Sequence, residues 1–147
     1  MKKQFLSLSL LLTIAAATSF ANTKIISGPG VEEVFNSEFT GARDVSWSRQ
    51  GDYQKATFVL AGHRTIAFYD DNNEFAGCIR DIFFDQLPIT VMKAIDKRFA
   101  GADFQEVREI TNNEGTSYLL VALTETKKYK VRVNMAGSIT DIEKLSK

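Results

Sequence analysis

A four-residue stretch that occurs twice constrains the fold of this chain more than any other feature. Phe39-Thr40-Gly41-Ala42 recurs sixty residues later as Phe99-Ala100-Gly101-Ala102. Apolar residues upstream match at the same offset: Val31 with Val91, Val34 with Ala94, and Phe35 with Ile95. Their spacing places each set on one face of an α-helix. The chain is therefore predicted to contain two copies of one structural unit.

Each unit is predicted to be a helix followed by four strands. The helices are expected near 31–40 and 89–100, each ending at a glycine, which adopts a left-handed C-cap at least cost. Alternating apolar residues and turn residues predict the strands. They lie near 43–49, 53–60, 64–69 and 75–82, and again near 104–110, 117–124, 128–133 and 138–145. Short connections favour antiparallel neighbours. The expected class is α+β, with two α-β-β-β-β units that share one sheet or pack together.

The N-terminus is interpreted as a secretory signal peptide covering 1–21. Lys2 and Lys3 precede an apolar run, and Ser19-Phe20-Ala21 supplies small residues before a cleavage point. The apolar run falls short of the roughly 20 residues that a membrane span needs. We therefore expect a periplasmic or secreted protein that starts near Asn22, without stable membrane insertion. Residues 22–30 are a lead-in, 31–82 the first unit, 83–88 a linker and 89–147 the second unit, together forming one compact domain.

The composition of the chain argues against some classes of function. Without Lys2 and Lys3 the mature chain has 16 basic and 18 acidic side chains, a net charge of −2, so nothing indicates a nucleic-acid partner. The single cysteine, Cys78, excludes an intramolecular disulfide. Nine Phe, four Tyr and one Trp remain to form a packed core.

The order of motifs resembles the PepSY-like, beta-lactamase-inhibitor-like family of secreted bacterial proteins. The likeness covers essentially the whole mature chain. The residues that carry it are Phe39 to Ala42, Val45-Ser46-Trp47, Tyr53, Ala56, Phe58 and Tyr69-Asp70, then Phe99 to Ala102, Tyr118, Val121, Leu123, Tyr129 and Val133.

The resemblance implies a fold more than a function. It implies tandem helix-plus-four-strand units, often joined in one curved eight-stranded sheet with both helices on one side. The beta-lactamase inhibitors of this family clasp an enzyme with the concave sheet face. This chain has a single cysteine and so lacks the cysteine pairs that staple those inhibitors. A shared fold does not by itself fix function.

Candidate reactive residues do not assemble into a recognisable catalytic or metal motif. His63 is the only histidine and is interpreted as a solvated turn residue, without the further ligands that zinc needs. Asp70-Asp71-Asn72-Asn73-Glu74 suggests calcium, but Phe75 replaces the glycine required at the sixth position, and a β-turn explains the same residues. Cys78 is expected to be buried and inert, with Arg80 on the same strand face. Nothing fixes the distance between Asp81 and Asp85. No catalytic, cofactor-binding or metal-binding residue is assigned.

Three functional hypotheses remain. The first is a secreted or periplasmic, non-enzymatic binding module that binds or inhibits another envelope or secreted protein. The second is an envelope protein that senses a small ligand or metal through its polar turns. The third is an uncharacterised hydrolase. No Gly-x-Ser-x-Gly motif supports the third hypothesis.

The partner-binding face is predicted from strand alternation, on the sheet face away from the helices. Lys128, Lys130 and Arg132 alternate with apolar residues and should face water. At an offset of sixty-four, Arg64, Ile66 and Phe68 become the outward set of the first unit. An offset of sixty-five would instead place Ile66 and Phe68 in the core.

Neighbouring strands complete the predicted face. We take Ala56, Phe58, Val121 and Leu123 as inward, so that their alternate residues point outward. The predicted partner-binding residues are Tyr53, Val59, Ile66, Phe68, Tyr118, Leu120, Lys128, Lys130 and Arg132. An exposed apolar patch of this kind usually marks a partner site.

Overall fold

The computed structural model describes residues 30–146. In this part of the chain, eight antiparallel strands form one open sheet in chain order, and two α-helices pack on it. The α+β class is as predicted, and of the two arrangements that the sequence left open, the shared sheet is the one observed. The signal peptide and nearly all of the lead-in lie outside the described residues.

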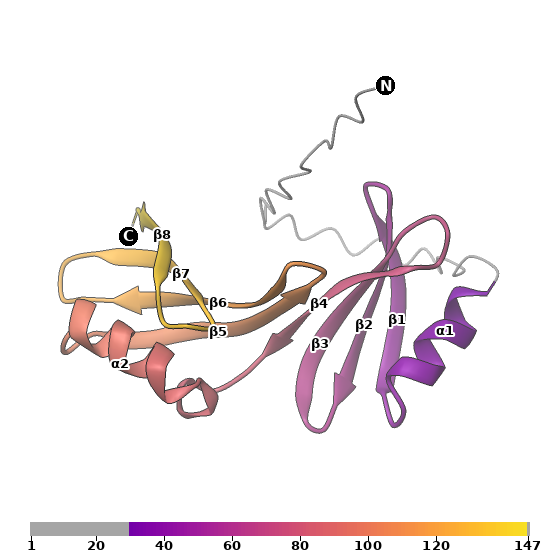
Figure 1. The fold of residues 1–147 in the computed structure, drawn as a ribbon, viewed down its shortest axis with the longest axis horizontal. Coiled ribbons are helices and arrows are strands. Elements are labelled where there is room, and N and C mark those ends of the chain that lie inside the picture. Colours follow the sequence, from indigo (N-terminus) through magenta and orange to yellow (C-terminus); the bar gives the residue numbers. More distant parts are fainter. Residues whose placement is uncertain (1–29, 147) are drawn as a thin grey trace.

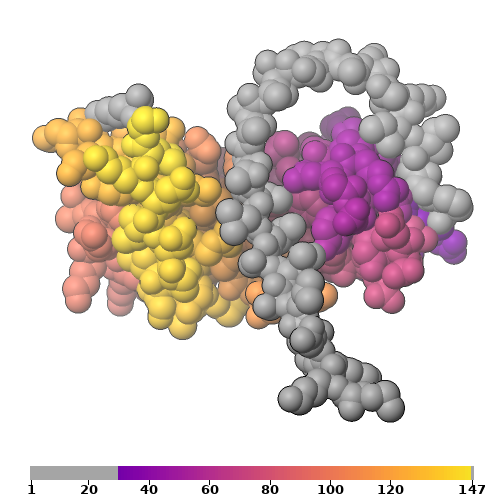
Figure 2. Space-filling model, turned by 90° about the horizontal axis from the view of Figure 1, so that it is seen from above, coloured from indigo at the N-terminus to yellow at the C-terminus, as the bar shows by residue number. Residues whose placement is uncertain are grey.

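The elements follow the predicted order twice (Figure 1). The first unit contains α1 (Val31–Glu38), β1 (Arg43–Gln50), β2 (Tyr53–Leu60), β3 (His63–Tyr69) and β4 (Phe75–Asp81). The second contains a short 3₁₀ turn η1 (Phe84–Gln86), α2 (Ile89–Arg98), β5 (Asp103–Asn112), β6 (Gly115–Leu123), β7 (Lys128–Asn134) and β8 (Ile139–Leu145). The space-filling view shows the first unit, in indigo to pink, beside the second, in orange to yellow (Figure 2).

The first core is an aromatic cluster between α1 and β1–β4. Phe35 of α1 is 2% exposed, and its ring centroid lies 4.9 Å from that of Phe58 and 5.4 Å from that of Trp47. Phe39 ends the helix, and its backbone N–H donates to the carbonyl of Phe35. Gly41 then takes a φ of 87°, the left-handed conformation expected after the helix. The chain can therefore turn straight from helix to strand.

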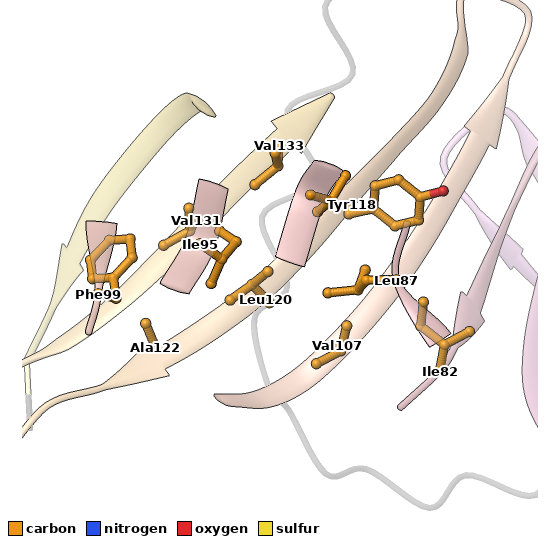
Figure 3. Packing of buried hydrophobic residues seen from close by; sticks show 11 residues of the cluster. Ile82, Leu87, Ile95, Phe99, Val107, Tyr118, Leu120, Ala122, Val131 and Val133 are labelled. Carbon is orange, nitrogen blue, oxygen red and sulfur yellow. The ribbon is translucent and has the colours of Figure 1, made fainter. Parts of the chain in front are cut away.

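The second core is aliphatic and repeats this arrangement (Figure 3). Val91 and Ile95 of α2 are fully buried, and Phe99 ends the helix at 6% exposure. They pack with Leu120 of β6 and Val131 of β7. The apolar stripe of a ten-residue helix thus meets the inward face of two central strands.

The two units join through β4 and β5. Residues 77–81 of β4 pair with residues 108–112 of β5, so the sheet is continuous. Thr65, Arg80, Glu109 and Tyr118 are successive register partners across this junction. Thr65 and Tyr118 are buried, so one sheet face carries both helices. The opposite face carries no helix, and we call it the open face.

A bulge occupies the same place in both units. Asp44 interrupts the pairing of β1 with β2 at a φ of 56°, and Glu106 interrupts the pairing of β5 with β6 at a φ of 50°. Such bulges increase local strand twist. Figure 1 shows the strands of the two halves running in clearly different directions, as a strongly twisted sheet requires.

Candidate functional site

The open face of the first unit carries an aromatic pair. Tyr53 of β2 and Phe68 of β3 place their ring centroids 6.5 Å apart in an edge-to-face arrangement. Both side chains are half-buried, whereas the neighbouring residues Gln54 and Tyr69 are buried on the helix side. The two rings therefore offer apolar surface away from the core.

A row of three isoleucines continues this surface across the unit boundary. Ile66 of β3 pairs with Ile79 of β4, which pairs with Ile110 of β5. All three are half-buried. Directly opposite residues in neighbouring strands share a face of the sheet. We call Tyr53, Phe68, Ile66, Ile79 and Ile110 the apolar strip.

Two glycines beside the apolar strip leave the open face without a side chain at their positions. Gly77 of β4 is the register partner of Phe68, and Gly115 follows in the same row on β6. A Cβ on Gly77 would stand 2.6 Å from the carbonyl oxygen of Thr111. The backbones of β4 and β5 therefore approach too closely at this point for any side chain.

The structure places most of the predicted face as expected in the first unit. Tyr53, Val59, Ile66 and Phe68 lie on the open face, with Ala56, Phe58 and Ala67 buried on the other. The offset of sixty-five, which would have buried Ile66 and Phe68, does not describe this strand. In the observed register, Ile66 of the first unit is equivalent to Arg132 of the second, which is an offset of sixty-six. This differs by two from the predicted sixty-four, so it leaves each side chain on the predicted face.

The prediction was wrong for Tyr118 and Leu120. They are 3% and 0% exposed and belong to the second core. Val59 and Val121 hold equivalent register positions, so β2 and β6 are related by an offset of sixty-two. Taking Ala56 and Phe58 together with Val121 and Leu123 as inward had assumed an offset of sixty-five. An odd error in register turns every side chain to the other face. Leu119, Val121 and Leu123 lie on the side of β6 away from the helices, paired with Arg132, Lys130 and Lys128, so the inward prediction for Val121 and Leu123 was wrong. Val121 is nevertheless only 5% exposed.

A signal in the sequence could have prevented this error. Thr124 and Lys127 close the β6–β7 hairpin with backbone and side-chain hydrogen bonds. This turn pairs Ala122 with Tyr129. Since Tyr129 was already assigned inward, hairpin register alone would have assigned Ala122, Leu120 and Tyr118 inward as well.

Charged residues cover the open face of the second unit. Lys128, Lys130 and Arg132 of β7 all lie there, as predicted. Lys130 Nζ lies 3.3 Å from Glu143 Oε2, and Lys128 Nζ lies 3.9 Å from Glu106 Oε1. The predicted basic strand is therefore partly neutralised by acidic residues of β8 and of the β5 bulge.

Asp81 connects the two units on the same face. Its carboxylate lies 3.2 Å from Arg108 Nε and 3.5 Å from Arg64 Nη1. Asp85, the other carboxylate considered in the sequence, lies in η1. The ion pairs hold Asp81 as a structural link between β3, β4 and β5.

The remaining reactive residues are engaged in structural contacts. His63 is the first residue of β3 and is half-buried, so its interpretation as a solvated turn residue was wrong. Its Nδ1 lies 2.9 Å from the carbonyl oxygen of Asp81, to which it can donate, and its ring contacts Phe83. Burial raises the pKa of the Cys78 thiol, and Glu109 raises it further against the opposing effect of Arg80.

The acidic turn between β3 and β4 satisfies its own backbone. Asp70 Oδ1 accepts hydrogen bonds from the N–H groups of Asn72 and Glu74, at 2.9 and 2.8 Å. Arg49 forms an ion pair with Asp71. Within residues 30–146, no group of three His, Cys, Asp or Glu side chains has a metal-binding arrangement.

Solved structures with the same architecture come from Bacteroides. A BLIP-like protein from Bacteroides fragilis matches 84% of this chain and 89% of its own, with a TM-score of 0.74 and 14% identity. The chain has the BLIP-like fold. A DUF2874 family protein from Bacteroides uniformis gives a TM-score of 0.74 at 18% identity, covering 81% of this chain and 90% of its own.

A third structure has the same fold. A protein of Bacteroides eggerthii whose name assigns it to the periplasm has a TM-score of 0.74 at 18% identity, covering 82% of this chain and 90% of its own. No protein-family model matches the sequence, and none of the curated proteins compared with it is similar. Neither described helix has the length and apolar character needed to cross a membrane.

Proposed function

We propose that this protein is a non-enzymatic binding module of the bacterial periplasm or exterior, and that its open face binds another envelope or secreted protein. The observation that carries the proposal is the apolar strip, in which Tyr53, Phe68 and three aligned isoleucines lie on a sheet face without a helix. Aromatic and aliphatic groups gathered on an otherwise polar surface are typical of binding hot spots.

The position of the strip supports a protein partner. It crosses the junction between the units, so a partner seated on it would contact both halves of the sheet. Secondary-structure elements hold every residue of the strip, which keeps the surface ordered before binding and lowers the entropy cost of association. The names of the structural neighbours, BLIP-like and periplasmic, are consistent with such a role.

The contacts of the reactive residues support a non-enzymatic role. His63 donates to a backbone carbonyl, and Asp81 is paired with two arginines. A general base must instead reach a substrate proton. The sensor hypothesis gains no support, because Asp70 uses its carboxylate within the turn.

The proposal is tested with two matched phenylalanine variants. Phe68→Ser removes a ring from the apolar strip, whereas Phe83→Ser removes a ring that is 71% exposed on the linker. The immobilised mature protein and both variants are incubated with an envelope extract of the source organism. Loss of a hot-spot aromatic costs about 2 kcal/mol, or roughly 30-fold in Kd.

We expect the wild type and Phe83→Ser to retain a stoichiometric protein that Phe68→Ser releases. Thermal unfolding of each variant shows whether the fold is intact. Equal retention by Phe68→Ser and the wild type, with the fold preserved, would overturn the proposal.

A further inference from the structure

The open-face cations differ in whether an acidic group neutralises them. Arg64 and Arg108 share Asp81, and Lys130 pairs with Glu143. Ion pairs of this kind are already satisfied, so they add little attraction for an external charge. The electrostatic character of the face therefore depends on the cations that have no such partner.

Lys55, Arg132 and Arg43 are those cations, and among residues 30–146 none of the three forms an ion pair. Arg43, the register partner of Val59, is exposed on β1, whereas Lys55 and Arg132 are half-buried on the open face. Arg132 has Asp141 as its register neighbour on the edge strand β8, but the two form no ion pair. Partial burial reduces screening by solvent, so both charges retain attraction for a carboxylate.

The two charges stand on opposite sides of the apolar strip. Lys55 is the register partner of Phe68 in the first unit. Arg132 lies on β7, beyond Ile110 and Leu119. Their strands are separated by five steps of about 4.8 Å, so the two residues are about 24 Å apart as measured across the strands. That span exceeds a small molecule and approaches the width of one side of a standard protein–protein interface.

We propose that the partner is an acidic protein, whose surface presents carboxylates to Lys55 and Arg132 on either side of an apolar contact with the strip. This inference rests on the proposed function and adds the chemistry of the partner. The mature chain has a net charge of −2, so attraction depends on this local arrangement rather than on overall charge. Complementary charges around an apolar centre mainly accelerate association and select the partner.

The test uses a double charge reversal with a matched control. Lys55→Glu with Arg132→Glu removes the proposed contacts, whereas Lys93→Glu with Lys97→Glu makes the same change in net charge on the exposed side of α2. Envelope proteins of the source organism are divided by anion exchange into acidic and basic pools. Each pool is applied to the immobilised full mature protein, the two charge variants and Phe68→Ser. Vesicles of phosphatidylglycerol serve as a non-protein anionic probe.

We expect capture of a protein from the acidic pool, reduced about tenfold or more by the Lys55 and Arg132 reversal and unchanged by the α2 control. Capture should also weaken between about 0.1 and 1 M NaCl, because the Debye length falls from about 10 to about 3 Å. Capture that Phe68→Ser abolishes and the open-face reversal leaves intact would overturn the acidic-partner inference alone. Capture from neither pool would overturn the proposed function with it. Binding to the vesicles without protein capture would replace the protein partner by a lipid surface.

Discussion

Leu119 and Leu120 provide a direct test of which way β6 faces. Leu120 is fully buried between α2 and the sheet, where its register partner is Val131. Leu119 is half-buried on the open face, beside Arg108 and Arg132 in register. Each residue is therefore the control for the other, because the substitution to alanine is chemically the same and the strand is unchanged.

The two substitutions should differ by several kcal/mol. Truncating the buried Leu120 to alanine loses the transfer free energy of the removed methyl groups and leaves a cavity. Together these should lower the free energy of unfolding by about 3–5 kcal/mol. Leu119→Ala loses only part of the transfer term, about 1 kcal/mol. At roughly 2.1 cal/mol/K per residue, a domain of this size shifts by about 4 °C per kcal/mol. The expected decreases in Tm are about 12–20 °C for Leu120→Ala and about 4 °C for Leu119→Ala.

Circular dichroism during heating and urea unfolding of the mature protein measures both values. An unchanged m-value for each variant shows that the comparison reflects stability rather than a changed unfolded state. Equal losses, or a larger loss for Leu119→Ala, would refute the facing of β6 and with it the extent of the open face.

Three further outcomes are expected. Tyr69 Oη donates to Glu38 Oε2 at 2.7 Å, and burial, followed by the effect of Glu38, raises the pKa of Tyr69 above its usual value of about 10. Because the tyrosine of the unfolded chain loses its proton at lower pH than that of the folded protein, the free energy of unfolding should fall as pH rises above about 10. Urea unfolding at increasing pH should show a smaller fall for Tyr69→Phe than for the wild type. Gly77→Ala should lower Tm more than Gly41→Ala, because its Cβ would meet a β5 carbonyl oxygen at 2.6 Å whereas nothing lies within 4 Å of a Cβ at Gly41. Intact mass of the exported protein should correspond to a chain starting at Asn22, and retention of Met1 would contradict the signal peptide.

The sequence was most informative where polar and apolar residues alternate. The strand 53–60 was predicted with its observed bounds, because Ala56 and Phe58 alternate with Lys55 and Thr57 and turn residues stand at both ends. The ends of the helices were predicted equally well, since Gly41 and Gly101 take the positive φ that the motif requires.

Alternation could not predict which side of β6 faces the core. Its residues 118–123 are all apolar, so alternation contains no marker of the inward side. The facing depends on hairpin register, and an error of one residue reverses it. The bulges at Asp44 and Glu106 are similarly unmarked, because a non-glycine residue at positive φ leaves no compositional signal.

The candidate site itself depends on contacts between distant residues. Asp81 and Arg108 are 27 residues apart and meet only because β4 pairs with β5. The row of isoleucines depends on the same pairing, as does the contrast between neutralised and unpaired cations. Tandem units could be predicted from the repeat, but the register at their junction required the structure.

Photo-crosslinking in living cells tests the central claim most directly. A photoreactive phenylalanine analogue is placed at position 68 on the open face, or at position 83 on the exposed linker, in protein exported by the source organism. If the open face binds an envelope or secreted protein, position 68 should give one predominant protein adduct that position 83 does not give. An adduct at position 83 alone, or none at position 68 in folded exported protein, would contradict the account.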